Sequence, residues 1–281
     1  MPFFLPPIII YYTPFAMRIL KSFLLIINYK TFVITALSLI ATWICHRNHW
    51  IADFPLILIS TAIVFPIVFS INSAYKRRES ALQQFSNIKG SAIAMYCASR
   101  DWVSASQNPV PEKLKVEFRE MLVAMRSLFY NNVEGHSLHA KEKIVYTHFN
   151  RISQATQELR DVGLNSSEIS RVNQYLSKII IAFDAMRNIA DYRTPITLRA
   201  YSKGFIYSFP ILYGPYFAYT IKDYGSQLGY VMPILYSFIL VSLDNIQDHL
   251  EDPFDEVGED DIQINIEEIM DLMHNETEIK K

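Results

Sequence analysis

The sequence predicts an all-α integral membrane protein, with four transmembrane helices in two hairpins and a helical body on the cytosolic side. Of its 281 residues, 51% are apolar and only 19% are charged, which is unusually hydrophobic for a soluble domain. Four apolar stretches approach the roughly 20 residues that a helix needs to cross a bilayer. No stretch shows the strict alternation of apolar and polar residues that is typical of a half-buried strand.

The N-terminal segment, residues 1–30, is predicted to lie at the membrane interface. Its opening, MPFFLPP, is apolar but contains three prolines. It lacks the basic region and the small-residue cleavage site of a secretory signal peptide. We therefore expect this segment to remain in the mature chain.

The first hairpin, predicted over residues 31–75, consists of two apolar runs. The run over 31–45 is short, but it reaches spanning length if the helix begins near Ser22 and Lys30 extends its ammonium group to the interface. The run over 54–75 contains no charged residue. It is the clearest of the four predicted spans.

Residues 76–203 are predicted to form the cytosolic helical body. Apolar residues recur there at spacings of three and four, which is typical of helices with one buried face. Polar segments rich in turn-forming residues interrupt this pattern. These breaks fall at residues 106–113, 131–137 and 163–168. In the last break, Asn165 or Ser166 is suited to cap the following helix.

The second hairpin, predicted over 204–243, contains the apolar runs 204–221 and 229–243, separated by the polar turn KDYGSQ. A strongly acidic segment, residues 244–281, follows it. This segment carries 14 acidic and 2 basic side chains, whereas the rest of the chain carries 14 acidic and 24 basic side chains. The acidity is therefore a property of the C-terminal segment and not of the whole chain.

Both chain termini are predicted to be cytoplasmic in this multi-pass topology. Lys and Arg near span ends favour the cytoplasmic side of a membrane. Basic residues precede the first and third spans and follow the second, whereas each predicted external loop contains only one Lys or Arg. The flanking residues are Arg18, Lys21, Lys30, Lys76, Arg77, Arg78, Arg193, Arg199 and Lys203.

The sequence contains none of the common catalytic motifs, such as G-x-S-x-G, G-x-G-x-x-G, a Walker loop or H-E-x-x-H. The histidine pairs His46/His49 and His136/His139 lack a third metal ligand at the usual spacing. We therefore expect no enzymatic activity and no cofactor, with calcium as the one ion that needs separate consideration. Nothing in the sequence indicates a nucleic-acid partner.

Three segments of the chain together are specific enough to compare with a known family. In FPIVFSINSAYKRRESAL, residues 65–82, an apolar span ends in small polar residues, a tyrosine and a basic run. The second and third segments are YRTPITLRAYSKGFIYSFP, residues 192–210, and LEDPF, residues 250–254. In this order they resemble the end of the second membrane helix, the entry into the third and the acidic segment after the fourth in the bestrophin family. In the first segment, the matching positions are Phe69, Asn72, Ser73, Ala74, Tyr75 and Arg77.

This resemblance implies a homopentameric ion channel whose single pore is lined by the second membrane helix. Thr61, Phe65 and Phe69 are four residues apart and share one helix face, and in the family this face forms a narrow apolar neck. Relatives usually have an aliphatic residue in place of Thr61. The alternative is that Phe65 and Phe69 only pack against neighbouring helices.

The end of the second span is predicted to form the cytosolic mouth of the pore. The residues concerned are Asn72, Ser73, Tyr75, Lys76 and Arg77. Residues 76–200 carry 18 basic and 12 acidic side chains, which would concentrate anions if the basic run faces a vestibule. The alternative is that the basic run only anchors the helix on the cytoplasmic side.

The acidic segment is a candidate calcium site, because animal bestrophins bind calcium there through the fourth and seventh positions after the proline. Those positions are Val257 and Asp260 here, or Gly258 and Asp261 if one residue is inserted, so one carboxylate is missing in either alignment. A rearranged set of oxygen ligands would come from Glu256, Glu259, Asp260 and Asp261. The alternative is that these acidic residues bind no ion and have a structural role.

In that alternative, Glu259, Asp260 and Asp261 stabilise the N-terminus of a helix over residues 262–273 through its dipole. Pro253 and Phe254 then pack the segment beneath the membrane helices.

The sequence therefore predicts a pentameric channel that conducts monovalent anions, chloride above all, and whose partners are other copies of the chain, membrane lipids and the permeant ions. Two alternatives remain. One is a channel of the same fold that conducts sodium or another monovalent cation. The other is a non-conducting membrane scaffold or receptor with a partner-binding helical body.

Overall fold

The structure, a computed structural model, describes residues 27–103, 108–130, 136–192, 196–254 and 261–273. Within these ranges the chain is all-helical and contains no strand, as the sequence predicts. The helices form two compact units. The interfacial segment predicted over 1–30 lies almost wholly outside the described residues.

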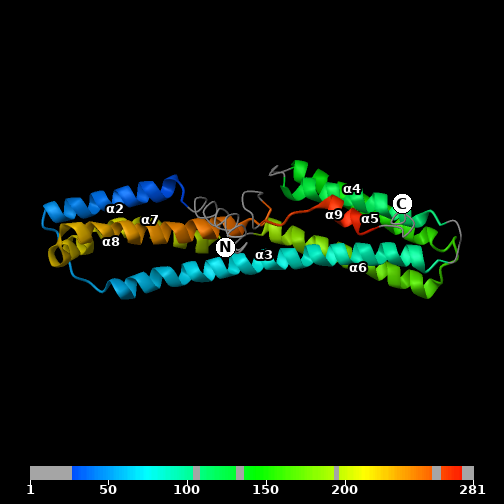
Figure 1. Ribbon diagram of the computed structural model, residues 1–281, viewed down its shortest axis with the longest axis horizontal. Coiled ribbons are helices and arrows are strands. Elements are labelled where there is room, and N and C mark those ends of the chain that lie inside the picture. Colours follow the sequence, from blue (N-terminus) through cyan, green and yellow to red (C-terminus); the bar gives the residue numbers. More distant parts are fainter. Residues whose placement is uncertain (1–26, 104–107, 131–135, 193–195, 255–260, 274–281) are drawn as a thin grey trace, which may run out of the picture. The chain divides into compact units, whose positions relative to one another are not determined.

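The first unit contains α2 (Tyr29–Arg47), the part of α3 (Leu56–Asp101) that ends at Lys76, α7 (Ile196–Leu212) and α8 (Gly214–Glu251). Helix α2 packs along both α7 and α8 (Figure 1). An apolar cluster joins all four helices. Its buried members are Ile34, Ile63, Ile67, Ile206, Leu240 and Val241.

Helix α2 begins at Tyr29 because Asn28 caps it. The Asn28 side-chain oxygen accepts hydrogen bonds from the backbone N–H groups of Lys30, at 3.0 Å, and Thr31, at 3.4 Å. This satisfies two N–H groups that have no partner within the helix. The predicted start near Ser22 is therefore wrong, and the helix has 19 residues.

The single span predicted over 204–221 is divided in the structure. Helix α7 begins earlier, at Ile196, and ends at Leu212, and α8 begins at Gly214. Pro215 lies in the first turn of α8, where a missing N–H group is tolerated, whereas inside a continuous helix it would remove a hydrogen bond. The proline thus favours a new helix start at this point.

Helix α8 consists of two arms that meet at Gly225, inside the polar turn predicted from KDYGSQ. Gly225 has φ 82° and ψ 162°, a backbone conformation that glycine adopts most readily. A Cβ atom placed on Gly229 would lie 2.5 Å from the Cα atom of Ile221. Residues eight apart in a straight helix are about 12 Å apart along the axis, so the chain reverses direction here.

Helix α3 is much longer than the span predicted over 54–75. It continues through the basic run to Asp101, a total of 46 residues. Lys and Arg are good helix formers, so a change from apolar to basic residues does not end a helix. Pro66 lies within α3, where it lacks the N–H group that would otherwise donate to the preceding turn.

The second unit contains α3 from Arg77 onwards, α4 (Val110–Tyr130), α5 (His136–Glu158), α6 (Ser166–Asp191) and the short α9 (Ile266–Asp271). Of the predicted breaks, residues 108–109 and 163–165 lie between helices, whereas 110–113, 136–137 and 166–168 already belong to the helices that follow. Asn165 caps α6, since its side chain accepts a hydrogen bond from the N–H group of Ser167 at 3.3 Å. The core is mainly apolar, and its largest fully buried side chains include Tyr96, Phe118, Met121, Leu122 and Phe183.

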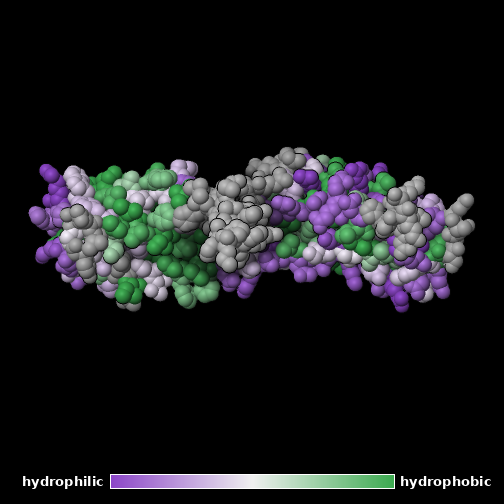
Figure 2. Space-filling view, in the orientation of Figure 1, coloured by the Kyte–Doolittle hydropathy of each residue, from purple (hydrophilic) through white to green (hydrophobic). Residues whose placement is uncertain are grey.

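The two units differ in their surfaces. On the face drawn in Figure 2, hydrophobic residues cover much of the first unit, whereas hydrophilic residues are widespread on the second. Two helices in the described part of the chain are long and apolar enough to cross a membrane, Tyr29–Arg47 and Gly229–Glu251. Both belong to the first unit.

Candidate pore face and internal polar network

The predicted neck residues lie on an exposed face of α3. Phe65 is 61% exposed and Phe69 is 55% exposed, and Thr61 is also exposed. The two phenylalanine rings contact each other edge to face, with centroids 4.8 Å apart. On the opposite side of the helix, Ile63 and Ile67 are buried in the apolar cluster. Within one chain, therefore, the phenylalanine rings do not belong to the core.

Two further apolar residues extend this face, and we refer to Ile57, Thr61, Phe65, Val68 and Phe69 together as the α3 face. Ile57 is 80% exposed and Val68 is 51% exposed. Sequence reasoning missed both, although they continue the spacing of three and four that links the other members. The Thr61 hydroxyl donates to the carbonyl of Ile57 at 2.7 Å, so this polar group is already partly satisfied by its own helix.

The predicted mouth residues divide into two kinds. Asn72, Ser73, Tyr75 and Lys76 are exposed, whereas Arg77 is half-buried. The Arg77 guanidinium donates to the carbonyl of Ile189 in α6 at 2.6 Å, so it ties two helices of the second unit together. This structural role was not predicted.

Of the predicted calcium ligands, only Asp261 lies within the described residues, where it is half-buried. Glu256, Glu259 and Asp260 lie outside them. Among the described residues, no group of three or more His, Cys, Asp or Glu side chains is placed to hold a metal ion.

The alternative role predicted for the acidic residues was to stabilise the N-terminus of a helix that begins at residue 262. That predicted helix start is wrong. The helix begins at Ile266 and not at 262, because Asn265 caps it by accepting from the N–H group of Glu268 at 3.4 Å. Glu267 and Glu268 occupy the first turn, where carboxylates interact favourably with the helix dipole. Asp261 precedes this turn by five residues.

Pro253 and Phe254 pack within the second unit, and their predicted place beneath the membrane helices remains a prediction. Phe254 stacks on Phe129 of α4, with ring centroids 4.7 Å apart, and is buried in the core of the second unit. The carbonyl of Pro253 accepts a hydrogen bond from the N–H group of Ile262 at 3.1 Å. Pro253 and Phe254 thus fasten the chain to α4.

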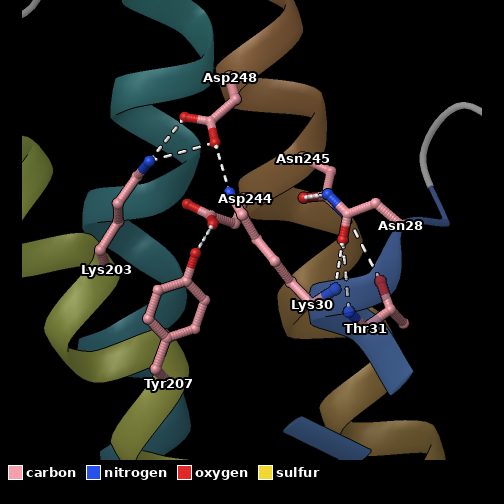
Figure 3. Close-up of polar contacts among 8 residues, drawn as sticks. All are labelled: Asn28, Lys30, Thr31, Lys203, Tyr207, Asp244, Asn245 and Asp248. Carbon is pink, nitrogen blue, oxygen red and sulfur yellow. Dashed lines mark hydrogen bonds and ion pairs between the residues drawn. The ribbon is translucent and has the colours of Figure 1, made fainter. Parts of the chain in front are cut away.

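A network of polar side chains lies inside the first unit, among α2, α7 and α8 (Figure 3). Asp248 binds Lys203 at 2.9 Å and Lys30 at 3.5 Å. One turn away, the hydroxyl of Tyr207 donates to Asp244 at 2.7 Å. Because a single carboxylate binds one lysine from α2 and another from α7, Asp248 links three helices.

Two further contacts extend the network. The Asn28 amide donates to the side chain of Asn245 at 2.8 Å, and Arg199 forms an ion pair with Glu251, which is only 4% exposed. Sequence reasoning missed the network. Its signal is the run DNIQDHLE at the end of the fourth apolar stretch, in which polar residues recur at spacings of three and four.

The fold is similar to that of solved bestrophin homologues. One crystal structure of a bacterial bestrophin homologue from Klebsiella pneumoniae, a point mutant, aligns with a TM-score of 0.75 and 14% identity, over 87% of this chain and 97% of that chain. Another structure of a bestrophin homologue from the same organism has a TM-score of 0.73 and 14% identity, over 87% and 96% of the two chains.

A crystal structure described as a membrane protein aligns with a TM-score of 0.74 and 14% identity, over 88% of this chain and 97% of that chain. No protein-family model matches the chain, and no curated protein matches it in sequence.

Proposed function

The chain has the fold of the bestrophin homologues, and on that premise we propose that it is a homopentameric ion channel that conducts monovalent anions, chloride above all. The observation that carries the proposal is the α3 face. Large apolar side chains stand exposed along one side of α3 while the other side is buried in the apolar cluster. In the proposed pentamer, five copies of this face surround the pore.

Rings of apolar side chains offer a physical mechanism for gating. Five symmetric copies of the α3 face would stack rings of Phe65 and Phe69 along one axis. An apolar constriction excludes water when it is narrow, and small outward movements admit water together with ions. The Thr61 ring would shorten the apolar part of this neck. We therefore propose that the neck is a gate and that Thr61 makes it easier to wet.

The surface of α2 supports placing the first unit in the membrane, with four spans in two hairpins and both termini in the cytoplasm. Its exposed apolar side chains form a stripe along the whole helix. They are Tyr29, Phe32, Val33, Leu37, Ile40, Trp43 and Ile44. Aromatic residues near both ends of such a stripe are typical of helices in contact with lipid. A stripe facing lipid leaves the α3 face free for the pore.

The proposed anion selectivity is supported by the charge of residues 76–200, which carry 18 basic and 12 acidic side chains. Lys76 is exposed on α3, two turns beyond Phe69, and in the proposed channel it attracts anions to the mouth. The strongly acidic segment 244–281 favours the second candidate, a channel of the same fold that conducts monovalent cations.

Reconstitution of the purified protein in a bilayer tests both candidates. In asymmetric sodium chloride, an anion channel gives a reversal potential near the chloride equilibrium potential, and a cation channel gives one near that of sodium. Absence of current would support a scaffold or receptor that does not conduct.

The double change Phe65→Ala and Phe69→Ala tests the neck in the same bilayers. It should increase the open probability or the conductance, because smaller side chains leave a wider and more easily wetted constriction. Phe32→Ala, which removes an exposed ring from α2, is the matched control and should leave the current unchanged. Equal effects of the two changes would contradict a neck on α3.

We further propose that the channel does not require calcium, because Val257 occupies the position of one of the two carboxylates that bind it in animal bestrophins. The current should then stay constant when calcium is titrated. Activation by calcium that disappears when Asp260 and Asp261 are both changed to Asn would instead support the rearranged set of ligands.

A further inference from the structure

Among the described residues, several buried polar atoms of the first unit have no hydrogen-bond partner. They include the hydroxyl oxygens of Ser70 and Ser202, one carboxylate oxygen of Asp244, and both the oxygen and the nitrogen of the Gln247 amide. The others are Nε of Arg199 and the hydroxyl oxygens of Tyr213 and Ser242. Ser70, Asp244 and Gln247 are fully buried, and Ser202 is 2% exposed. In Figure 3, only one oxygen of Asp244 makes a contact, the hydrogen bond from Tyr207.

These residues continue the helix faces that form the apolar cluster, and we refer to Ser70, Ser202, Asp244 and Gln247 together as the polar layer. Ser70 follows Ile67 by three residues on α3, and Ser202 precedes Ile206 by four on α7. Asp244 follows Leu240 by four on α8, and Gln247 follows Asp244 by three. Residues three or four apart share a helix face. Ser70, Ser202 and Asp244 therefore lie one turn beyond the cluster, and Gln247 lies two turns beyond it.

A dry layer of this composition would be unfavourable, because a buried polar group without a partner loses its hydrogen bonds to water and gains nothing in return. Folded proteins satisfy such groups with buried water, about one molecule per 27 residues, each making about three hydrogen bonds. Here the layer offers hydroxyl groups that donate and accept, a carboxylate that accepts, and an amide that does both.

The charges nearby favour a neutral ligand over a cation. Both lysines of the network, Lys30 and Lys203, bind Asp248, while Asp244 receives only the hydroxyl of Tyr207. These two lysines and two aspartates carry equal and opposite formal charge, so an added cation would leave an excess positive charge beside the fully buried Asp244. A water molecule adds no charge.

We propose that ordered water molecules occupy this layer and connect α3, α7 and α8 through Ser70, Ser202, Asp244 and Gln247. Asp244 is the principal acceptor, because its second oxygen is fully buried and receives no hydrogen bond from any residue that the structure describes. Helix α3 then contacts the α7–α8 pair in two ways. The contacts are apolar in the apolar cluster, and they are mediated by water in the polar layer next to it. This inference rests on the burial and hydrogen bonding of the first unit, and not on ion conduction.

The first test is a cryo-electron microscopy map of the intact assembly in lipid nanodiscs, at a resolution that shows bound water. Density within hydrogen-bond distance of Asp244 and of at least one of the two serines is expected. A well-resolved layer without such density would overturn the proposal, whatever the variants described next do.

The second test uses Ser70→Ala and Ser202→Ala, with thermal unfolding as the measurement. If water satisfies these hydroxyl groups, each change removes a hydrogen bond and lowers the melting temperature. Ser237→Ala is the matched control, because Ser237 is also fully buried but donates to the carbonyl of Pro233 at 2.6 Å. If the layer is dry, removing an unpaired hydroxyl raises the melting temperature above that of the unchanged protein, and the proposal is wrong.

A third measurement separates water from a bound cation. A ligand that binds only the folded protein raises its melting temperature as the ligand concentration increases. Unfolding in sodium, potassium and choline chloride at equal ionic strength should therefore give the same melting temperature. If the melting temperature rises only in sodium or potassium, and Asp244→Asn abolishes the rise, then a cation and not water occupies the layer.

Discussion

At the scale of single residues, the polar network contains two kinds of ion pair that differ in burial. Glu251 is 4% exposed and binds Arg199, whereas Asp248 and its two lysines each retain about a third of their side-chain exposure. Water and salt screen the second kind much more strongly than the first. Burial, and not the number of contacts, should therefore decide which carboxylate contributes more to stability.

We predict that Glu251→Gln destabilises the protein more than Asp248→Asn. The first change replaces a buried carboxylate by a neutral amide and weakens its charge-assisted hydrogen bond from Arg199, whose side chain is 27% exposed, at a cost of about 2 kcal/mol. The second affects partly exposed groups and should cost about 1 kcal/mol. Denaturant unfolding of both variants measures the difference. Equal losses would mean that the burial of Glu251 has no energetic consequence.

Asn28 offers a test of the helix start. Asn28→Ala removes the cap of α2 and the hydrogen bond to Asn245, and should lower the free energy of unfolding by about 1–2 kcal/mol. Asn28→Ser keeps a capping oxygen but not the amide, so it should recover part of the loss. No recovery by Ser would indicate that the contact with Asn245, and not the cap, is the important one.

At the scale of elements, the reversal within α8 depends on a close approach of its two arms. A Cβ atom on Gly229 would lie 2.3 Å from a side-chain carbon of Ile221 and 2.5 Å from its Cα atom. Because one of these atoms belongs to the backbone, a side-chain rotation cannot relieve the overlap. The arms would have to move apart.

We therefore predict that Gly229→Val destabilises the protein strongly, by about 2–3 kcal/mol or more. Gly204→Ala is the matched control, since a Cβ atom there meets nothing within 4 Å. It should be neutral or stabilising by up to about 1 kcal/mol, because alanine favours a helix more than glycine does. Thermal unfolding in detergent or nanodiscs measures both changes. Similar melting temperatures for the two variants would contradict the close approach.

The helix boundaries show which features the sequence could predict. The existence of the helices followed from their apolar periodicity, and the turn at Gly225 followed from polar residues around a glycine. The end of α3 could not be found in the same way, because hydropathy changes at Lys76 while helix propensity does not. The start of α2 depended on a single side chain, Asn28, whose capping contact is a matter of geometry.

The candidate sites also differ in how far the sequence predicts them. The α3 face follows from residue spacing along one helix, so Phe65 and Phe69 were predictable as neighbours. The polar network joins Lys30, Lys203 and Asp248, which are far apart in the sequence. Their meeting depends on how α2, α7 and α8 pack, and periodicity within each helix does not determine that packing.

At the scale of the whole molecule, the proposed pentamer predicts a definite mass. Native mass spectrometry of the detergent-solubilised protein should show an assembly of five chains of 32.6 kDa each. The change Val68→Glu should weaken this assembly, because it would place five carboxylates around one axis, where like charges repel. Glu in place of Val33, on the exposed stripe of α2, is the control. A stable monomer in the unchanged protein would contradict the pore.

The hydrogen bond between Ile262 and the carbonyl of Pro253 has an electrostatic consequence. The eight residues between these two positions include five carboxylates, and the bond holds both ends of this short stretch together. Tyr130 reinforces one end, since its hydroxyl accepts from the N–H group of Ile264 at 2.7 Å. Mutual repulsion among five negative charges opposes this closure, and dissolved salt weakens the repulsion. The attachment of this stretch to α4 should therefore tighten as ionic strength increases, and amide hydrogen exchange at Ile262 should slow accordingly.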